Sequence, residues 1–288
     1  MKASDIFWPA PAKLNLMLRV IGRRADGYHL LQTVFQFLAE ADLIRFQHRR
    51  DGDIRCTSLP GVRDDDNLAI LAARLLQQYG KCNHGADIEI RKKLPMGGGL
   101  GGGSSNAATT LVVLNKLWKL NLDEAELARL GLQLGADVPV FIHGKAAWAE
   151  GVGEKLHFFT PPEPWYLVLS PACHVSTAEI FCDSQLTRDA KAITIRDFSA
   201  GQRVNTCQTL VANRHPEVGR ALSWLDQFAE GRLTGTGACV FAEFPSQQQA
   251  EQALNEIPAD MKGFVSPGLN RSPLHTKLER FTGAWPSG

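Results

Sequence analysis

The sequence predicts an α+β protein with two domains. Its 288 residues are enough for about two domains of ordinary size. The expected strands and helices follow one another without strict alternation, which favours an α+β architecture over a doubly wound parallel sheet. Three prolines interrupt the pattern between Thr160 and Pro164 and indicate a domain boundary there. We therefore expect one domain over residues 1–160 and a second over residues 161–288.

The composition is that of an ordinary globular protein. Hydrophobic residues make up 44% of the chain and charged residues 21%, and the formal net charge is +1. This balance argues against a nucleic-acid partner and against attraction to an acidic membrane surface. No apolar run approaches the roughly 20 residues of a membrane-spanning helix, and residues 1–12 lack the apolar core of a secretory signal.

The six cysteines are scattered, with no CxxC pair and no spacing typical of a zinc site. A disulfide framework would be unusual in a chain of this length. We expect reduced thiols in a soluble cytoplasmic protein that needs no obligate protein partner.

The N-terminal region predicts a hairpin. Apolar and polar residues alternate from Lys13 to Val20, which indicates a half-buried strand with Lys13 and Asn15 side by side on its polar face. An Asp-Gly pair within residues 23–27 predicts a turn, and the chain returns as a second strand from Tyr28 to Phe37. The hairpin would bring Tyr28 and His29 towards the first strand.

The remaining elements follow from capping residues and apolar spacing. A helix is expected to begin at residues 64–67, with Leu68, Leu71, Leu75 and Leu76 as its apolar stripe. After a glycine-rich loop, Ser104 or Ser105 can cap a helix that runs to about Leu120. The other expected elements are a strand over 86–90, a helix over 123–132, a turn over 134–137, a strand over 165–169, a loop over 234–237 and a strand over 239–244.

The glycine-rich loop is the most unusual segment of the chain. Several glycines allow backbone N–H groups to converge on an anion, and the helix that follows adds its free N–H groups and the positive end of its dipole. A nucleotide phosphate suits such a site. The candidate phosphate-binding residues are Pro95, Met96, Gly97, Gly98, Gly99, Leu100, Gly101, Gly102, Gly103, Ser104 and Ser105.

Three other interpretations of the loop fit less well. A flexible linker rarely opens a capped helix. The ordinary P-loop requires a Lys-Ser or Lys-Thr pair after the glycines, and none is present. Gly97, Gly99 and Gly102 match the dinucleotide-binding pattern GxGxxG, with Asp123 near the expected offset of about 20 residues. However, Asp123 opens a helix instead of ending a strand, so a dinucleotide-dependent oxidoreductase is only the alternative.

The loop resembles the phosphate loop of the GHMP kinase superfamily of small-molecule kinases. Three further parts of the chain resemble this superfamily in the same order: residues 11–16 with 24–29, residues 134–141 and residues 233–241. The loop has an extra glycine before its serine pair, and Lys13 stands where relatives often have arginine. Both features resemble the branch that acts on a cytidine diphosphate substrate in the non-mevalonate route to isoprenoid precursors.

The resemblance implies a fold and a reaction. It implies an N-terminal ATP-binding α/β domain with a mixed sheet and a C-terminal ferredoxin-like α+β domain. The implied reaction transfers the γ-phosphoryl group of ATP to the 2-hydroxyl of the methylerythritol part of the substrate, with Mg²⁺ neutralising phosphate charge. Another small-molecule GHMP kinase, or a nucleotide-binding protein without activity, remains an alternative.

The resemblance also implies roles for two charged residues. Asp137 matches the general base of the family, which accepts the proton of the attacking hydroxyl. Lys13 matches the lysine beside that base and the substrate hydroxyl. Without the resemblance, Asp137 would be a turn or capping residue and Lys13 a surface lysine.

The remaining expected site residues recognise substrate or nucleotide. Tyr28 and Phe181 match an aromatic pair around cytosine, and His29 matches the residue on the edge of the base. Asn15 is expected to hydrogen-bond the acceptor, and Thr177 is expected to bind the substrate. Asn67 and Lys92 match residues that line the adenosine pocket. Ser104 and Ser105 are expected to contact phosphate, one of them near Mg²⁺, and no carboxylate can be assigned as a metal ligand.

Overall fold

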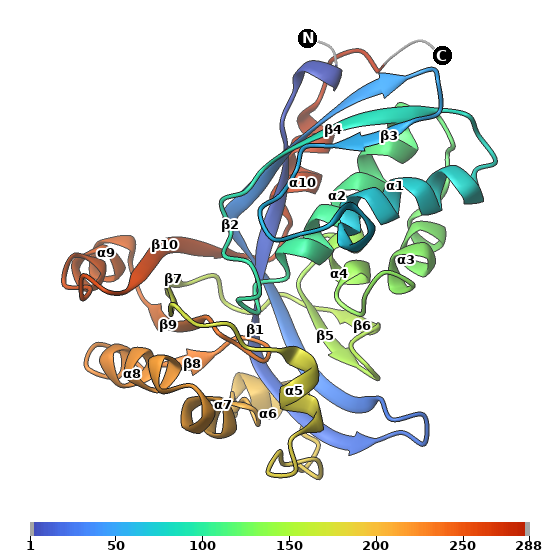
Figure 1. The fold of residues 1–288 in the computed structure, drawn as a ribbon. Coiled ribbons are helices and arrows are strands. Elements are labelled where there is room, and N and C mark those ends of the chain that lie inside the picture. Colours follow the sequence, from blue (N-terminus) through green and yellow to red (C-terminus); the bar gives the residue numbers. More distant parts are fainter. Residues whose placement is uncertain (1–2, 286–288) are drawn as a thin grey trace.

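The structure, a computed structural model, describes residues 3–285 (Figure 1). A long hairpin runs through the molecule from end to end, with helices α1–α4 beside its upper part and the C-terminal elements α5–α9 and β7–β10 beside its lower part. Both termini lie at the upper end in this view. No helix in the described part of the chain is long and apolar enough to cross a membrane.

The hairpin consists of β1 (Trp8–Arg23) and β2 (His29–Arg49), paired antiparallel. The predicted hairpin is confirmed, but the prediction of a half-buried first strand is wrong. Lys13 and Asn15 are only 2% and 3% exposed, as deeply buried as the leucines that alternate with them. The reason is that helices and loops from both halves of the chain cover the two faces of β1, which alternation within one strand cannot reveal.

The hairpin is the centre of a mixed sheet that extends into both halves of the chain. Its strand order is β3-β4-β2-β10-β7-β9-β8, with β1 and β5 paired to β2 and β6 paired to β5. Among these pairs of strands, β3 and β4 are parallel and the others are antiparallel. The remaining strands are β3 (Ile54–Cys56), β4 (Gly85–Arg91), β5 (Ala147–Glu150), β6 (Lys155–Phe158), β7 (Trp165–Ser170), β8 (Arg232–Leu233), β9 (Val240–Phe244) and β10 (Lys262–Leu269).

Two helices of the N-terminal half begin where capping residues predicted them. Asn67 caps α1 (Leu68–Tyr79) by accepting from the N–H of Ala69, and Asp123 caps α3 (Glu124–Leu132) in a capping box with Glu126. Of the predicted leucine stripe of α1, Leu76 is fully buried, whereas Leu68, Leu71 and Leu75 are only partly buried. The rest of the buried side is formed by Ile70 and by alanines, whose small side chains allow close packing against α2 (Gly102–Leu117). The short helices η1 (Ala3–Asp5), η2 (Asp64–Asp66) and α4 (Val138–His143) complete this half.

The start of α2 differs from the prediction. Gly101, with φ of 71°, is the residue before the helix, so Ser104 and Ser105 lie inside its first turn and neither caps it. A left-handed glycine lets the chain pass from the loop into the helix without a side-chain cap. The helix ends at Leu117, and Trp118, which follows it, is buried.

Six helices follow β6 in the described part of the chain. They are α5 (Thr177–Cys182), α6 (Ile195–Ser199), α7 (Gln208–Arg214), α8 (Pro216–Leu225), α9 (Gln247–Asn255) and α10 (Pro273–Arg280). Separate apolar cores surround α2 in one half and α7, α8 and β9 in the other. A third core along β1, with Leu14, Met17 and Phe241, joins them. This third core therefore contains residues of both halves of the chain.

The chain after β10 returns to the N-terminal half. Lys277 Nζ donates to the carbonyl of Phe7 (2.6 Å), and the indole of Trp8 stacks on that of Trp285, with centroids 5.6 Å apart. The expected division at residue 160 stays a prediction.

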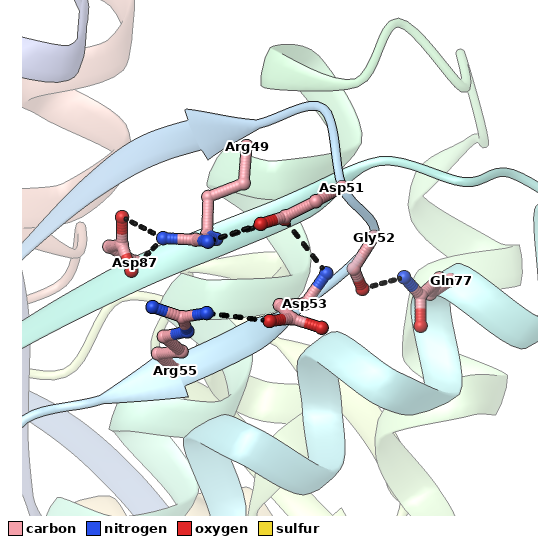
Figure 2. Close-up of polar contacts among 7 residues, drawn as sticks. All are labelled: Arg49, Asp51, Gly52, Asp53, Arg55, Gln77 and Asp87. Atoms are coloured by element: carbon pink, nitrogen blue, oxygen red, sulfur yellow. Dashed lines mark hydrogen bonds and ion pairs between the residues drawn. The ribbon is translucent and has the colours of Figure 1, made fainter.

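Ion pairs occupy the edge of the sheet near the turn that joins β2 to β3 (Figure 2). Arg49 pairs with Asp51 and, at 3.1 Å, with Asp87, while Gln77 of α1 donates to the carbonyl of Gly52 (2.8 Å). Exposed pairs of this kind contribute roughly 0–1 kcal/mol each. This edge is a solvated surface that ties α1 to the sheet.

Candidate active site

A cavity of about 690 Å³ lies between the two halves of the chain. Its volume is within the range of roughly 300–1,000 Å³ typical of small-molecule sites. The glycine loop and the first turn of α2 form one wall, and residues near α5 and the loop 235–237 form another. The predicted site residues that line it are Lys13, Asn15, Asn67, Lys92, Pro95, Met96, Gly97, Gly98, Gly99, Leu100, Gly101, Gly102, Gly103, Ser104, Asp137, Thr177 and Phe181.

Three predicted residues do not line this cavity. Ser105 is fully buried inside α2. Tyr28 lies at the tip of the hairpin with 64% of its surface exposed. His29, the first residue of β2, lies beside Phe181, which does line the cavity.

The glycine loop is held by a second loop behind it. Gly99 has φ of +75°, and a Cβ there would lie 2.2 Å from the carbonyl oxygen of Thr234. Thr234 Oγ1 donates to the carbonyl of Gly99 (3.3 Å), and Cys239 N donates to that of Gly98 (3.1 Å). The prediction that residues 234–237 pack behind the phosphate loop is therefore confirmed. After the glycine loop, the first turn of α2 presents free N–H groups, which makes this part of the cavity wall a favourable place for an anion.

Lys13 is a buried cation with a full set of acceptors. Its backbone N–H donates to the carbonyl of Leu100 (3.0 Å), which fixes β1 against the loop. Its Nζ donates to the carbonyl of Gly99 (3.0 Å) and to Asn15 Oδ1, and lies 3.1 Å from Asp137 Oδ2. An ammonium has three N–H donors, so each is used.

Asn15 connects Lys13 to the neighbouring strand β2 and to the second glycine loop, residues 234–237. Its Nδ2 donates to Thr33 Oγ1 (2.8 Å), which in turn donates to the carbonyl of Met17 (2.7 Å). Its backbone N–H donates to Thr234 Oγ1 (3.0 Å). These bonds hold the amide so that its oxygen faces the ammonium of Lys13.

Asp137 stands at the turn before α4, which follows the predicted Leu134–Asp137 turn. Its side chain is 33% exposed, whereas that of Lys13 is 3% exposed. The carboxylate therefore faces the open cavity while the cation lies behind it. Such an arrangement leaves one carboxylate oxygen able to accept a proton from a bound molecule.

The other end of the cavity contains Asn67 and Lys92. Asn67 Nδ2 lies 3.5 Å from Cys56 Sγ while its oxygen caps α1. Lys92 Nζ pairs with Asp42, whose other oxygen accepts from the N–H groups of Lys93 (2.8 Å) and Leu94 (2.9 Å). Asp42 is fully buried in β2 and holds the segment that enters the glycine loop.

Sequence reasoning missed Asp42. The signal that could have revealed it is a carboxylate between the apolar residues Ala41 and Leu43 of a strand, because buried carboxylates are rare unless paired.

Two of the residues predicted to recognise a base, His29 and Phe181, meet at one end of α5. The ring of His29 stacks on that of Phe181, with centroids 5.0 Å apart and planes 20° apart. Burial, followed by the charges of Arg188 and Arg23, lowers the pKa of His29. Thr177 Oγ1, at the start of the same helix, lies 2.8 Å from Thr236 Oγ1 of the second glycine loop.

Family models match both halves of the chain. The model of the GHMP kinases N terminal domain matches residues 67–145, and that of the GHMP kinases C terminal domain matches residues 188–263. The first match contains the glycine loop and Asp137, and the second contains the loop that packs behind it. The class of protein that this fold and site define is the GHMP kinases, which transfer a phosphoryl group from ATP to a small molecule.

Comparison with individual relatives identifies one family within the GHMP kinases. The chain is 55% identical to a 4-diphosphocytidyl-2-C-methyl-D-erythritol kinase of Shewanella putrefaciens, over 94% of this chain and 96% of that protein. It is 54% identical to an enzyme of the same name from Pseudomonas syringae pv. syringae, over 97% and 99% of the two chains. The chain belongs to the family of these 4-diphosphocytidyl-2-C-methyl-D-erythritol kinases.

A crystal structure of 4-(cytidine 5'-diphospho)-2C-methyl-D-erythritol kinase has the same fold. The TM-score is 0.80 at 28% sequence identity, over 91% of this chain and 99% of the other. The predicted two-domain α+β GHMP kinase fold is thus confirmed. The oxidoreductase alternative has no support, since Asp123 caps α3 and no strand ends there.

Proposed function

We propose that this chain transfers the γ-phosphoryl group of ATP to the 2-hydroxyl of 4-diphosphocytidyl-2-C-methyl-D-erythritol, giving ADP and the 2-phosphate. The reaction belongs to the non-mevalonate route to isoprenoid precursors. The observation that carries the proposal is the Lys13–Asp137 pair, 3.1 Å apart, on the wall of the cavity that also contains the glycine loop. The identity of the substrate in this proposal is taken from the names of the relatives.

Asp137 acts as the general base in this proposal. Its partly exposed carboxylate can accept the proton of the attacking hydroxyl as the bond to phosphorus forms. The buried ammonium of Lys13 stabilises the negative carboxylate and the oxygen that develops charge during attack. The contacts of Lys13 with Gly99 and Asn15 keep the ammonium in place before substrate binds.

The glycine loop and the first turn of α2 bind the phosphates of ATP. Backbone N–H groups and the helix dipole supply this affinity. Asn67 and Lys92 lie at the end of the cavity where we place adenosine.

Mg²⁺ is expected with the nucleotide. Residues 3–285 contain no group of three or more metal-binding side chains, which fits an ion held mainly by phosphate oxygens. Ser104 lines the cavity in the first turn of α2, and its hydroxyl would be the protein oxygen that holds the ion. When bound, the ion neutralises charge on the β- and γ-phosphates.

His29 and Phe181 recognise cytosine in this proposal. Their stacked rings form a flat apolar wall with a polar ring edge. Tyr28 is exposed beside them, and the proposal requires it to fold onto the opposite face of the base when substrate binds. Asn15 contacts the acceptor in this proposal, and Thr177, which lines the cavity, binds the substrate. If Tyr28→Ala leaves the KM for the cytidine substrate unchanged, this role of Tyr28 is wrong.

The deciding experiment measures ADP release from Mg-ATP with and without the cytidine substrate. We expect substrate-dependent release by the wild type and a decrease of about 10²–10⁴-fold in Asp137→Asn. Asp65→Asn, an exposed aspartate on η2, is the matched control and should turn over like the wild type. Equal turnover by Asp137→Asn would show that another group is the base.

A simpler measurement separates the rival classes. Mg-ATP or ADP should raise the melting temperature, and NAD(P) should not; the reverse would contradict a kinase. Cytoplasmic location and activity without a protein or nucleic-acid partner also belong to this proposal. Cell fractionation and the size of the purified active enzyme would check them.

A further inference from the structure

Arg188 connects the hairpin tip to the end of α5. Its Nε donates to His29 Nε2 (3.1 Å), and its Nη2 donates to the carbonyls of Phe181 (2.9 Å) and Asp183 (2.7 Å). Its Nη1 donates to the carbonyl of Leu186 (3.2 Å). Across residues 3–285 no carboxylate lies within ion-pair distance of its guanidinium. The donors of this half-buried cation are therefore directed at neutral acceptors.

These contacts fix two residues that come from distant parts of the chain. His29 begins β2, and Phe181 lies in the last turn of α5. One guanidinium holds the imidazole of the first and the backbone of the second. Because the group is planar and rigid, the bonds to His29 and Phe181 also fix the relative position of the stacked rings.

The bond to His29 has a consequence for the proton on its ring. An arginine Nε always carries hydrogen, since guanidinium does not lose its proton in proteins. His29 Nε2 must therefore be the acceptor, so the ring is neutral and its hydrogen is on Nδ1. Burial and the neighbouring charges of Arg188 and Arg23 lower the pKa of His29, which agrees with a neutral ring. No other described residue hydrogen-bonds Nδ1, so this N–H is available to a ligand.

We infer that Arg188 is a positioning residue for base recognition, which holds His29 as the Nδ1–H tautomer against Phe181 so that the site presents one hydrogen-bond donor to the edge of a pyrimidine. The inference rests on the proposed function for the identity of the ligand. N3 of cytosine is an acceptor, whereas N3 of uracil carries hydrogen. A fixed donor accepts the first base and opposes the second, so Arg188 contributes to discrimination between cytidine and uridine nucleotides.

The tautomer is tested first, on the full-length enzyme without ligand. Long-range ¹H–¹⁵N correlation spectra at about pH 8, above the ordinary pKa of histidine, distinguish Nδ1–H from Nε2–H rings. A His29→Gln variant assigns the signal. We expect the Nδ1–H form in the wild type and a shift towards Nε2–H in Arg188→Met. An Nε2–H ring at His29 in the wild type would overturn the inference.

A matched control separates this effect from general support of α5. Arg214 Nε donates to the Asp183 side chain (3.1 Å) and has no hydrogen bond to His29 among the described residues. Arg214→Met should leave the tautomer of His29 as in the wild type. If Arg188→Met does not fold, Arg188→Lys replaces it: the lysine keeps the charge but not the rigid planar group, and it should also lose the fixed tautomer. A tautomer that shifts equally in Arg214→Met would overturn the inference.

Steady-state kinetics then test whether Arg188 contributes to recognition of the cytosine base. In Arg188→Met, the KM for the cytidine substrate should rise about tenfold, the size expected for one lost hydrogen bond, with kcat and the KM for ATP nearly unchanged. The preference for CDP over UDP, measured as inhibitors, should fall by a similar factor. An equal rise in both KM values, or an unchanged preference, would overturn the inference. Failure of the wild type to use the cytidine substrate would instead contradict the proposed function, because the spectra decide the tautomer independently.

Discussion

The Lys13 ammonium lies 3.1 Å from Asp137 Oδ2, although the two residues come from the first strand and from the turn before α4. The ammonium is almost completely buried, while a third of the carboxylate side chain is exposed to the cavity. A buried cation of this kind is stabilised only if each of its donors has an acceptor, and Gly99 and Asn15 supply the other two. The side chain of Lys13 thus holds the glycine loop and the turn that carries Asp137 together.

Replacing Lys13 with methionine should greatly slow the reaction. The change keeps the length of the side chain but removes the charge beside Asp137 and the developing oxyanion. We expect kcat to fall by about 10²–10³, the size seen when one transition-state donor is removed. ADP release under saturating substrates measures this effect.

The pair should act as a unit. The double variant Lys13→Met/Asp137→Asn should therefore be about as slow as the slower single variant, because residues that act together are strongly non-additive. Rate losses that multiply would mean that the two side chains act independently in the transition state. The melting temperatures of all three variants show whether any loss reflects unfolding.

Gly99→Ala should destabilise the loop. The backbone has φ of +75°, and the added Cβ would lie 2.2 Å from the carbonyl oxygen of Thr234. The left-handed conformation alone costs about 1–3 kcal/mol for a residue with a side chain. Chemical denaturation should show at least this loss of unfolding free energy, together with weaker ADP binding.

Gly103→Ala is the matched control for stability. Gly103 lies in the first turn of α2, and a Cβ there meets only a Leu68 methyl group at 3.4 Å. Its unfolding free energy should stay the same or rise by up to about 1 kcal/mol, the difference in helix propensity between glycine and alanine. If both alanine variants lose equal stability, the close approach to Thr234 is not the cause.

Asp42→Asn should lower stability and weaken nucleotide binding together. The change leaves the ammonium of Lys92 without its anion and disturbs the segment that enters the glycine loop. Breaking a buried pair by changing one partner typically costs about 3–5 kcal/mol.

Glu89→Gln is the control for Asp42→Asn. Glu89 also pairs with basic residues, Arg45 and Arg91, but on the exposed side of the sheet, where a pair contributes no more than about 1 kcal/mol. Chemical denaturation should therefore show a much larger loss of unfolding free energy in Asp42→Asn than in Glu89→Gln. Similar losses in the two would mean that the burial of Asp42 has little energetic effect.

The thiols should react in the order of their exposure. Burial raises the pKa of Cys207 and of Cys239 to about 12, so both stay protonated and unreactive at any pH near neutral. Cys182 is exposed. Peptide mass spectrometry should find iodoacetamide on Cys182 first, and a rise from about pH 7 to about pH 9 should not label Cys239 while the protein is folded. Early labelling of Cys239 would show that the contact between Gly98 and the second loop opens.

The sequence was a good guide wherever the determining interaction was local. Asn67 and Asp123 cap helices with bonds to N–H groups two or three residues away, so their positions were predictable. The helix after the glycine loop was predicted with the wrong start, because a left-handed Gly101 replaces the expected serine cap. The face of β1 that carries Lys13 was predicted as solvated and is buried, since its covering comes from residues far along the chain.

By itself, the sequence determined a phosphate-binding loop before a helix, a two-strand hairpin and, through resemblance, a kinase family. Only the tertiary structure decided that the ammonium of Lys13 meets Asp137, that Asp42 holds Lys92, and that Arg188 bonds His29. The physical reason is that each of these contacts joins residues from separate elements. Their partners depend on how the strands and helices pack, and no local pattern of charge or hydrophobicity specifies that packing.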